Sequence, residues 1–547
     1  MSQQKLVIPK EFYKVDVAKK MILSNYDLSS INGNSGINTI TLDQDYAFKS
    51  PANNVEVGES YELFAIKNGN EYVLYFTELP IVTINTPSVI VDTPKVLAEF
   101  SLSETGKPEI KSKIGIEYRG ASSQAYPKKS LEIEFWEDND GTSTKDIPIL
   151  GMMNHDSFNL QAMYSEDSRV RSKTGNDLWL QMSTLSYQEK EPEGKNGILG
   201  HFVEMFMNGE YYGVYNLSEK VNRKNLKLKK YKDGIRGELY KGKDWGGTTL
   251  YSYDTSFDNT SAMWSSFEFK HPKGYFDWQN LYNFVSFVVD ADHTTFAQQI
   301  ASKFEVDNAI DYYIFLNVLR AIDNTGKNLY IAKYDKNTKY FYVPWDLDAA
   351  FGYSWDSTQL NDYGGLLTNG LYDKLFKNTQ TDIFRQQLGK RWQELRQTFI
   401  THENIMSLFN ENHEYLVRNK VLEREAKAWD YTENPTALNY MSEWLQNRIN
   451  YLDGQFGPML ATENISKATE KSIVYYPNPV KDQLSIVNKY GEKGIIKIYS
   501  ATGQLVYLSY AFKGEETVDT SKLPDGIYFG KFETGDRSES FKIIVAK

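Results

Sequence analysis

The chain has 547 residues, of which 41% are hydrophobic and 24% are charged, which suits roughly three or four soluble globular domains. Its net charge of −11 argues against general nucleic-acid binding, because phosphate backbones are held by clustered lysines and arginines. The absence of cysteine excludes disulfides, thiolate nucleophiles and cysteine-ligated zinc. No apolar run is long enough to span a bilayer, and the N-terminus lacks the apolar region of a signal peptide. The protein is therefore expected to be cytoplasmic or to have had an export signal removed.

Strand-like segments dominate the first half of the chain. Residues 1–79 contain short alternating stretches separated by Asn- and Gly-rich turns, which predicts a small β domain. The Pro- and Thr-rich residues 80–94 have the pattern of edge strands that enter a second domain. Strands continue over residues 96–243, with one helical stripe near residues 167–181.

Helical periodicity dominates residues 274–456 and includes a long apolar helix that ends just before Asp323. Residues 457–471 are polar and without periodicity, which suits a linker. Short alternating strands with Gly-containing turns then predict an independent β-sandwich over residues 472–547. We therefore expect an α+β protein in which residues 80–456 form two lobes, a β-rich small lobe and a helical large lobe, between two flanking β domains.

Acidic and amide side chains between Asp323 and Gly352 have a spacing that indicates phosphoryl transfer. Asp323 and Asn328 show the D-x-x-x-x-N spacing of a protein-kinase catalytic loop. Asp346 and Asp348 follow a hairpin-like segment, where a kinase keeps its metal-binding aspartate. Two aspartates and one asparagine could supply the protein ligands of Mg²⁺, which keeps several water molecules in its coordination shell. Turn formation is the competing interpretation, because D-N-T-G is also a good turn sequence.

An upstream turn offers groups that could hold phosphates. This turn contains Gly and Ser, with Arg119, Ser122 and Ser123, and leads into a strand that begins with Lys128 and Lys129. In nucleotide sites, phosphates are held by backbone N–H groups of such a turn and by a lysine on the adjoining strand. Strand side chains alternate, so Lys129 is expected on the same buried face as the apolar residues that follow and is the preferred ligand. The alternative is a solvated lysine pair that opens an edge strand.

A third motif places cations at the start of the predicted helix. Asp167 or Ser168 can cap this helix, which carries Arg169 and Arg171 in its first turns. Cations oppose the helix dipole at that end, so a nearby carboxylate or phosphate is expected. An ordinary surface salt bridge is the alternative for both arginines.

Two glutamates lie on a predicted hairpin whose strands are joined by an N-G turn. Glu204 and Glu219 stand among apolar neighbours on these strands. A partly buried carboxylate usually has a cationic partner, so either glutamate could orient Lys129 at the nucleotide. The spacing does not choose between them.

Several motifs together carry a family resemblance. They are Y-R-G-A-S-S with P-K-K-S-L, D-S-R-V-R-S-K, G-V-Y-N-L-S-E-K-V, A-I-D-N-T-G-K-N-L-Y and V-P-W-D-L-D-A-A-F-G. In this order, over about residues 80–455, they resemble the CotH family of spore-coat kinases, which are similar to atypical protein kinases. The resemblance implies a divergent kinase-like fold, ATP as donor and a divalent metal such as Mg²⁺ or Mn²⁺. It also implies that Asp323 is the catalytic aspartate and that Asn328 and Asp346 bind metal, with Asp348 as a second candidate. The G-x-G-x-x-G, H-R-D and D-F-G motifs of ordinary kinases are absent.

The C-terminal segment resembles a second family. Its motifs are Y-Y-P-N-P-V-K-D-Q-L-S-I, I-Y-S-A-T-G-Q-L-V-Y, L-P-D-G-I-Y-F-G-K-F and F-K-I-I-V-A-K. They are similar to the sorting domain of the type IX secretion system of Bacteroidetes, over about residues 472–547. This resemblance implies a secreted or cell-surface protein that engages the type IX machinery and whose N-terminal signal has been trimmed. A generic β-sandwich binding module is the alternative.

The leading hypothesis is a secreted CotH-like kinase that transfers the γ-phosphoryl group of ATP to a Ser- or Thr-type hydroxyl of an unknown protein acceptor. In this hypothesis Lys129 and Arg171 contact the phosphates, and Asp323 positions the acceptor. One alternative is a surface adhesion or assembly protein that keeps the fold without turnover. Another is a glycan-binding or glycan-cleaving protein, suggested by the ten tryptophans and the flanking β domains.

Overall fold

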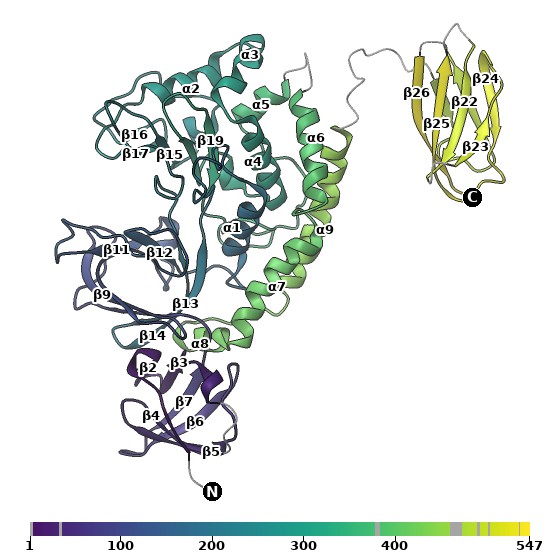
Figure 1. The fold of residues 1–547 in the computed structure, drawn as a ribbon. Helices are drawn as coiled ribbons and strands as arrows, with labels where there is room; N and C mark the ends of the chain where they lie inside the picture. The colour runs from purple at the N-terminus through teal and green to yellow at the C-terminus, as the bar shows by residue number, and fades with distance from the viewer. Residues whose placement is uncertain are drawn as a thin grey trace. The chain divides into compact units, whose positions relative to one another are not determined.

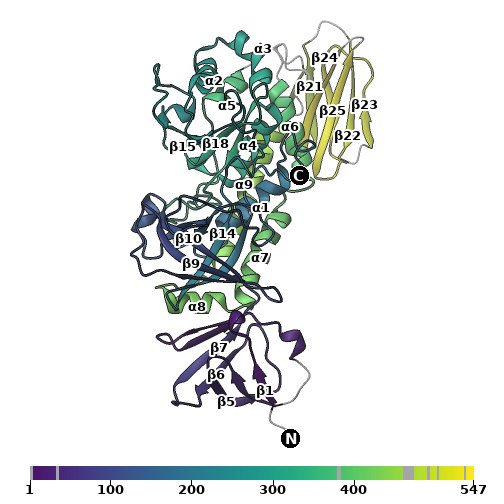
Figure 2. The same ribbon diagram turned by 60° about the vertical axis from the view of Figure 1, so that its left-hand side comes forward.

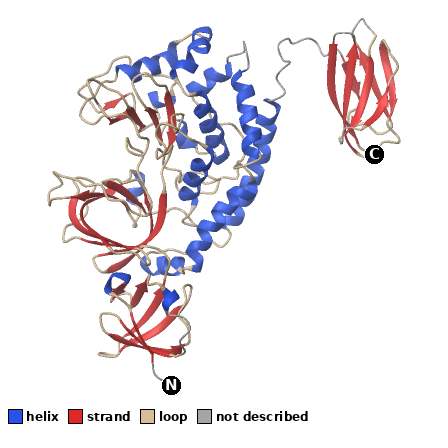
Figure 3. Ribbon diagram, viewed as in Figure 1, coloured by secondary structure: helices blue, strands red, loops and turns tan. Residues whose placement is uncertain are grey.

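The computed structural model describes residues 4–31, 36–377, 383–459, 473–489, 493–501, 504–534 and 537–547. The chain divides into two compact units, Met1–Thr462 and Glu463–Lys547 (Figure 1). The first unit contains both sheets and helices, and the second contains strands, so the protein is α+β as predicted (Figure 3).

The N-terminal strands form one seven-stranded sheet in the order β1-β4-β5-β6-β7-β3-β2. Its strands are β1 (Gln4–Val7), β2 (Tyr13–Asp16), β3 (Met21–Ser24), β4 (Ile37–Thr41), β5 (Asp45–Ala52), β6 (Ser60–Ala65) and β7 (Glu71–Phe76). Alternating side chains such as Ile40, Leu63 and Leu74 are fully buried in one hydrophobic core. This sheet therefore has a core of its own.

The next seven strands close into a barrel in the order β10-β11-β12-β14-β13-β8-β9. They are β8 (Ile81–Asn85), β9 (Val96–Ser103), β10 (Ile110–Arg119), β11 (Ser130–Trp136), β12 (Ser157–Gln161), β13 (Gly200–Met207) and β14 (Glu210–Ser218). Inward side chains, among them Ile116, Ile133 and Leu160, fill the interior. The predicted N-G turn joins β13 to β14, and Asn208 and Gly209 both adopt the left-handed φ, 51° and 85°, that a two-residue hairpin requires.

A five-stranded sheet in the order β16-β17-β15-β18-β19 carries the candidate site. Its strands are β15 (Glu238–Gly242), β16 (Met263–Trp264), β17 (Phe267–His271), β18 (Leu329–Lys333) and β19 (Tyr340–Pro344). Helix α4 (Val306–Leu319) packs against this sheet and is buried on every side from Asn308 to Leu319. The helix is mostly apolar because it runs through the core, and its end delivers the chain to Asp323.

The remaining helices of the first unit surround this sheet or connect it to the barrel (Figure 3). They are α1 (Arg171–Met182), α2 (Gln279–Asp290), α3 (His293–Lys303), α5 (Gly370–Lys377), α6 (Ile383–Arg396), α7 (His402–Arg418), α8 (Val421–Ala428) and α9 (Ala437–Phe456). Helix α8 lies between the barrel and the N-terminal sheet in both views (Figures 1 and 2). Its Glu423 accepts a hydrogen bond from Tyr75 of β7, and its Glu425 accepts one from the backbone N–H of Val214 in β14. None of the helices in the described ranges is long and apolar enough to cross a membrane.

The second unit is a sandwich of two sheets, β20-β21-β24 and β23-β22-β25-β26. Its strands are β20 (Ile473–Tyr476), β21 (Gln483–Asn488), β22 (Ile495–Ser500), β23 (Leu505–Leu508), β24 (Gly514–Asp519), β25 (Gly526–Thr534) and β26 (Arg537–Val545). Buried residues from both sheets, such as Ile486 and Phe532, share one core. The predicted linker at 457–471 falls mainly on residues 460–471, which lie outside the described residues.

Candidate functional site

One hairpin brings two of the predicted site residues together. Asn328 directly precedes β18 and Asp346 follows β19 after one residue, and these two strands pair antiparallel, with Leu329 opposite Pro344. The backbone N–H of Trp345 donates to the carbonyl oxygen of Asn328 at 3.1 Å. Asn328 and Asp346 both adopt left-handed φ angles, 53° and 57°. Left-handed backbone is uncommon for non-glycine residues and is concentrated at functional turns, so both residues are held in a special conformation at the same end of the hairpin.

Asn324 fixes this end of the hairpin, although no sequence motif singled it out. Its side-chain amide donates to two backbone carbonyls, of Asn328 at 2.6 Å and of Trp345 at 2.7 Å. Asn324 is buried, and its own carbonyl accepts a hydrogen bond from Tyr312 of α4 at 2.8 Å. The Asn of D-N-T-G therefore ties the turn to both hairpin strands.

Asp323 lies close to Asp346. It stands in a short 3₁₀ turn (Ile322–Thr325) directly after α4 and is half-buried. Burial raises the pKa of Asp323 above its ordinary value, the Lys327 ammonium opposes this, and the Asp346 carboxylate adds to it. The D-N-T-G stretch is thus a turn, and this turn brings the carboxylate of Asp323 within electrostatic reach of Asp346.

Asp348, together with Asp323 and Asp346, forms an acidic group at this end of the hairpin. Burial and the carboxylates of Asp346 and Glu166 raise the pKa of Asp348 well above its ordinary value, while the Arg171 guanidinium opposes them. Arg171 donates from Nε to the carbonyl oxygen of Asp348 at 2.9 Å, and its guanidinium carbon lies 4.0 Å from the ring centroid of Tyr353. The structure therefore brings Arg171 to the W-D-L-D segment.

The oxygen ligands at the hairpin end are of the kind that Mg²⁺ or Mn²⁺ binds. No group of three or more His, Cys, Asp or Glu side chains in the described part of the chain is arranged to hold a metal ion. Asp346 and Asp348 supply two carboxylates, and the Asn328 side chain forms no hydrogen bond with any described residue. Two carboxylates and a free amide oxygen suit an ion that keeps several waters. A cation there would also relieve the repulsion that raises the pKa of Asp348.

The helix cap differs from the prediction. Helix α1 begins at Arg171, and neither Asp167 nor Ser168 caps it. The buried carboxylate of Glu166 accepts hydrogen bonds from the backbone N–H groups of Arg171, at 2.6 Å, and Ser172, at 3.1 Å, and from the Ser172 hydroxyl. The carboxylate expected near this cationic helix end is thus Glu166, which reaches back from the preceding turn because its side chain is long enough.

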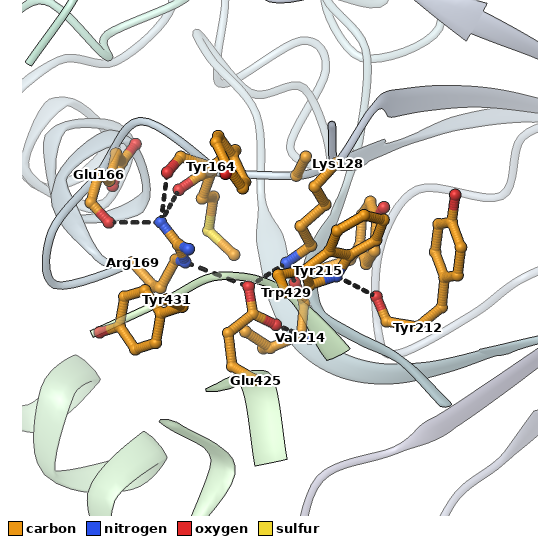
Figure 4. Close-up of polar contacts among 12 residues, drawn as sticks. Lys128, Tyr164, Glu166, Arg169, Tyr212, Val214, Tyr215, Glu425, Trp429 and Tyr431 are labelled. Atoms are coloured by element: carbon orange, nitrogen blue, oxygen red, sulfur yellow. Dashed lines mark hydrogen bonds and ion pairs between the residues drawn. The ribbon is translucent and has the colours of Figure 1, made fainter. Parts of the chain in front are cut away.

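The prediction that Lys129 is the buried lysine is wrong. Strand β11 begins at Ser130, so the alternation of strand side chains does not extend back to either lysine. Lys128 is 1% exposed, and its Nζ binds Oε1 of Glu425 at 2.6 Å and the Val214 carbonyl at 2.5 Å (Figure 4). Lys129 is half-buried, and its Nζ donates to backbone carbonyls of its own turn.

Glu425 is the carboxylate partner of Lys128, and no sequence pattern pointed to it. It also accepts a hydrogen bond from Nε of Arg169 at 3.3 Å, so it lies between two buried cations (Figure 4). Burial nonetheless lowers the pKa of Lys128 to about 8. Glu425 is 297 residues from Lys128 in the chain, and no local motif links them. Arg169 belongs to this junction of barrel and α8, and the structure does not place it with the acidic group.

Neither Glu204 nor Glu219 contacts Lys128 or Lys129. Glu204 accepts from Nε of Arg424 at 2.8 Å and from the Tyr211 hydroxyl at 2.8 Å. Glu219 accepts from two backbone N–H groups and from Nζ of Lys195 at 3.2 Å. Glu204 is therefore occupied by helix α8 and a barrel tyrosine, and Glu219 by loops that flank the barrel.

The Gly- and Ser-containing turn contributes differently from what was expected. Ser122 and Ser123 start a short 3₁₀ turn (Ser122–Ala125), with Ser122 exposed and Ser123 half-buried. Arg119 ends β10, and its guanidinium carbon lies 5.3 Å from the ring centroid of Trp345, the residue before Asp346. The structure thus brings Arg119 to the hairpin end, where a second cation, Lys241 of β15, also lies over the Trp345 ring.

Comparisons with known proteins give one family match in each of the two compact units. No curated protein matches the chain. The family profile described as a secretion system C-terminal sorting domain matches residues 474–546, so the protein is delivered by type IX secretion to the cell surface or released from it. The profile described as CotH kinase protein matches residues 116–452, more than half of the chain, and the chain therefore belongs to the CotH family.

Proposed function

We propose that residues 80–456 form a divergent kinase-like domain that transfers the γ-phosphoryl group of ATP to a Ser- or Thr-type hydroxyl of a protein acceptor. In this proposal the barrel is the small lobe, and the five-stranded sheet with its helices is the large lobe. The observation that carries the proposal is the hairpin end, where Asn328 and Asp346 meet beside Asp323. The D-x-x-x-x-N spacing and the family membership support the same reaction.

Asp323 is the group that handles the acceptor hydroxyl. The hydroxyl oxygen forms a bond to the γ-phosphorus, the bond between this phosphorus and the β–γ bridging oxygen breaks, and ADP leaves with the electron pair. The carboxylate of Asp323 accepts the hydroxyl proton, and its raised pKa makes it a better base than an ordinary aspartate. Its fixed place after α4 orients the hydroxyl for this attack.

The side chains of Asp346, Asp348 and Asn328 would hold Mg²⁺ or Mn²⁺. When bound, the cation neutralises phosphate oxygens and the charge that develops on them. Arg171 holds the W-D-L-D backbone through the Asp348 carbonyl, so it keeps the Asp348 carboxylate next to Asp346. Asn324 does the same for Asn328 and Trp345.

Incubation of the full chain with radiolabelled ATP and Mg²⁺ or Mn²⁺ tests this function. Label should appear on an added protein mixture or on the enzyme itself, and the variant Asp346→Ala should transfer none. Nucleotide binding should also raise the thermal stability of the first unit, by about 2.7 kcal/mol at a hundredfold the dissociation constant. A protein that transfers no label and shows no nucleotide-dependent shift would instead be a surface adhesion, assembly or glycan-binding protein that keeps the fold.

A further inference from the structure

Two cations meet beside the acidic group without a carboxylate partner. Arg119 comes from the barrel and Lys241 from the five-stranded sheet, and both lie over the indole of Trp345, at 5.3 and 5.9 Å from the ring centroid. Trp345 is 4% exposed, and both cations are half-buried. Neither the guanidinium nor the ammonium forms a hydrogen bond or ion pair with any residue that the structure describes.

The neighbouring cations of the barrel and the sheet are neutralised by acids. Lys95 binds Glu117 at 2.8 Å and Glu132 at 3.1 Å, and Lys333 of β18 binds Glu238 at 3.3 Å. A partly buried cation loses hydration, and an opposite charge normally compensates for that loss. Glu268 stands opposite Lys241 on the neighbouring strand, but its carboxylate binds Lys270 at 3.0 Å. Two such cations on one aromatic ring, neither bonded to an acid, therefore mark a place where an anion from outside the chain would bind.

Lys241 is fixed close to both the acidic group and the catalytic turn. Burial and the cations Arg119 and Lys243 lower the pKa of Lys241 to about 8, and the Asp346 carboxylate opposes them. The next residue, Gly242, passes so close to the Asp323 turn that a Cβ there would lie 2.5 Å from the Gly326 carbonyl oxygen. The strand that carries Lys241 thus packs directly on the turn that carries Asp323.

We propose that Arg119 and Lys241 bind the polyphosphate chain of a nucleoside triphosphate, with Trp345 holding both side chains in place. The nucleotide identity of the ligand rests on the proposed function, whereas the anion site rests on the two unpaired cations. Lys241 then takes the role that the sequence suggested for Lys129, whose Nζ is already occupied by the carbonyls of Gln124 and Tyr126, each at 2.6 Å. Phosphate oxygens accept charge-assisted hydrogen bonds from both a guanidinium and an ammonium, so this pair of side chains suits them.

Calorimetric titration of the full chain with Mg²⁺–ATP and, separately, with inorganic tripolyphosphate tests the proposal. Lys241→Met should weaken the binding of both ligands by about 10- to 100-fold, because one charge-assisted contact is lost. Lys241→Arg should keep part of the affinity. The matched control is Lys229→Met, which removes a lysine that also lies over an aromatic ring, 4.9 Å from the centroid of Tyr334, but that is already paired with Glu191 at 2.7 Å. This control should change the affinity by less than about threefold.

Amine labelling of the wild-type protein followed by peptide mass spectrometry gives a readout that needs no variant to fold. Tripolyphosphate should protect Lys241 from labelling and leave Lys229 unprotected. Wild-type binding that Lys241→Met does not weaken, or labelling of Lys241 that tripolyphosphate does not slow, overturns the anion site while the proposed kinase reaction stands. Tripolyphosphate binding that depends on Lys241 in a protein that transfers no phosphate leaves the anion site standing and overturns the proposed reaction.

Discussion

Two clusters of charged side chains in the first unit follow opposite rules. At the junction of the barrel with α8, Glu425 lies between Lys128 and Arg169, so each buried charge has a partner (Figure 4). At the end of the β18–β19 hairpin, burial and, after it, the Asp346 carboxylate raise the pKa of both Asp323 and Asp348. Like charges are thus gathered at the hairpin and opposite charges are matched at the junction.

The difference separates structural charges from ligand-binding ones. In a buried cluster of opposite charges, each charged side chain has its partner within the protein, and the cluster holds two parts of the fold together. A cluster of like charges, with the unpaired cations Arg119 and Lys241 beside it, is compensated only in part by Arg171 and Lys327, and a bound ligand would complete the compensation. Sequence motifs alone did not make this distinction, because K-K and D-S-R-V-R were assigned to the same nucleotide site as D-N-T-G-K-N.

The largest expected effect comes from removing the base at the hairpin end. Asp323→Asn keeps the shape of the side chain but cannot accept the hydroxyl proton, so phosphoryl transfer should fall by about 10²- to 10⁴-fold. Stability should hold or rise, because burial disfavours the Asp323 carboxylate. Single-turnover kinetics and urea unfolding measure the two quantities.

The control for this variant lies at the far end of the same hairpin. Asp335→Asn removes an acid that binds Arg236 in the turn between β18 and β19, and transfer should persist at the wild-type rate. If Asp323→Asn retains more than a tenth of the wild-type rate, Asp323 does not act as the base, and the hairpin cluster loses its proposed catalytic role.

At the junction, the expected effect is on stability. Glu425→Ala leaves Lys128 and Arg169 buried without their carboxylate, which should lower the free energy of unfolding by about 3–5 kcal/mol. All ten tryptophans precede residue 457, so tryptophan fluorescence during urea unfolding reports the first unit alone. Glu423→Ala on the same helix removes a carboxylate that is 47% exposed and should cost less than about 1 kcal/mol. Equal losses for the two variants would contradict the view that pairing at the junction stabilises the fold.

The sequence predicted what lies within a short stretch of chain. The N-G turn specified the β13–β14 hairpin, and the strands between Asn328 and Asp346 form one hairpin whose ends must meet. Helical periodicity likewise marked α4 before Asp323. In each case the signal and the structure span fewer than about twenty residues, so local chemistry decides the outcome.

What the sequence could not predict depends on partners that are distant in the chain. Glu425 and Lys241 have no motif of their own, because their roles arise only when α8 packs on β14 and β15 packs beside the Asp323 turn. Closure of the barrel requires β8 to pair in parallel with β13, more than a hundred residues later. The wrong assignment of Lys129 has a local cause, because it assumed that β11 begins two residues earlier than it does.

A smaller effect is expected from Asn324, which supports the hairpin cluster without belonging to it. Asn324→Ala leaves the buried Trp345 carbonyl without its side-chain donor and the Asn328 carbonyl with the Trp345 N–H alone, which should cost about 1–3 kcal/mol of stability. The rate of phosphoryl transfer should fall as well, because Asn328 and Asp346 are no longer held at one end of the hairpin. Stability lost at an unchanged rate, measured well below the unfolding temperature, would show that Asn324 serves the fold and does not position the site.

The smallest effect concerns how well the junction pairs its charges. Burial lowers the pKa of Lys128 to about 8 in the folded protein, whereas an unfolded lysine titrates at about 10.4. Between these values the unfolded chain binds more protons, so this group makes the free energy of unfolding rise with pH, by at most about 1.4 kcal/mol per pH unit. Below pH 8 both states are protonated and the contribution is constant. The wild-type protein should therefore gain stability relative to Lys128→Met between pH 8 and pH 10 in parallel urea titrations. A flat difference over this range would mean that Glu425 holds the proton on Lys128 despite burial, so that the junction is more completely matched than the lowered pKa implies.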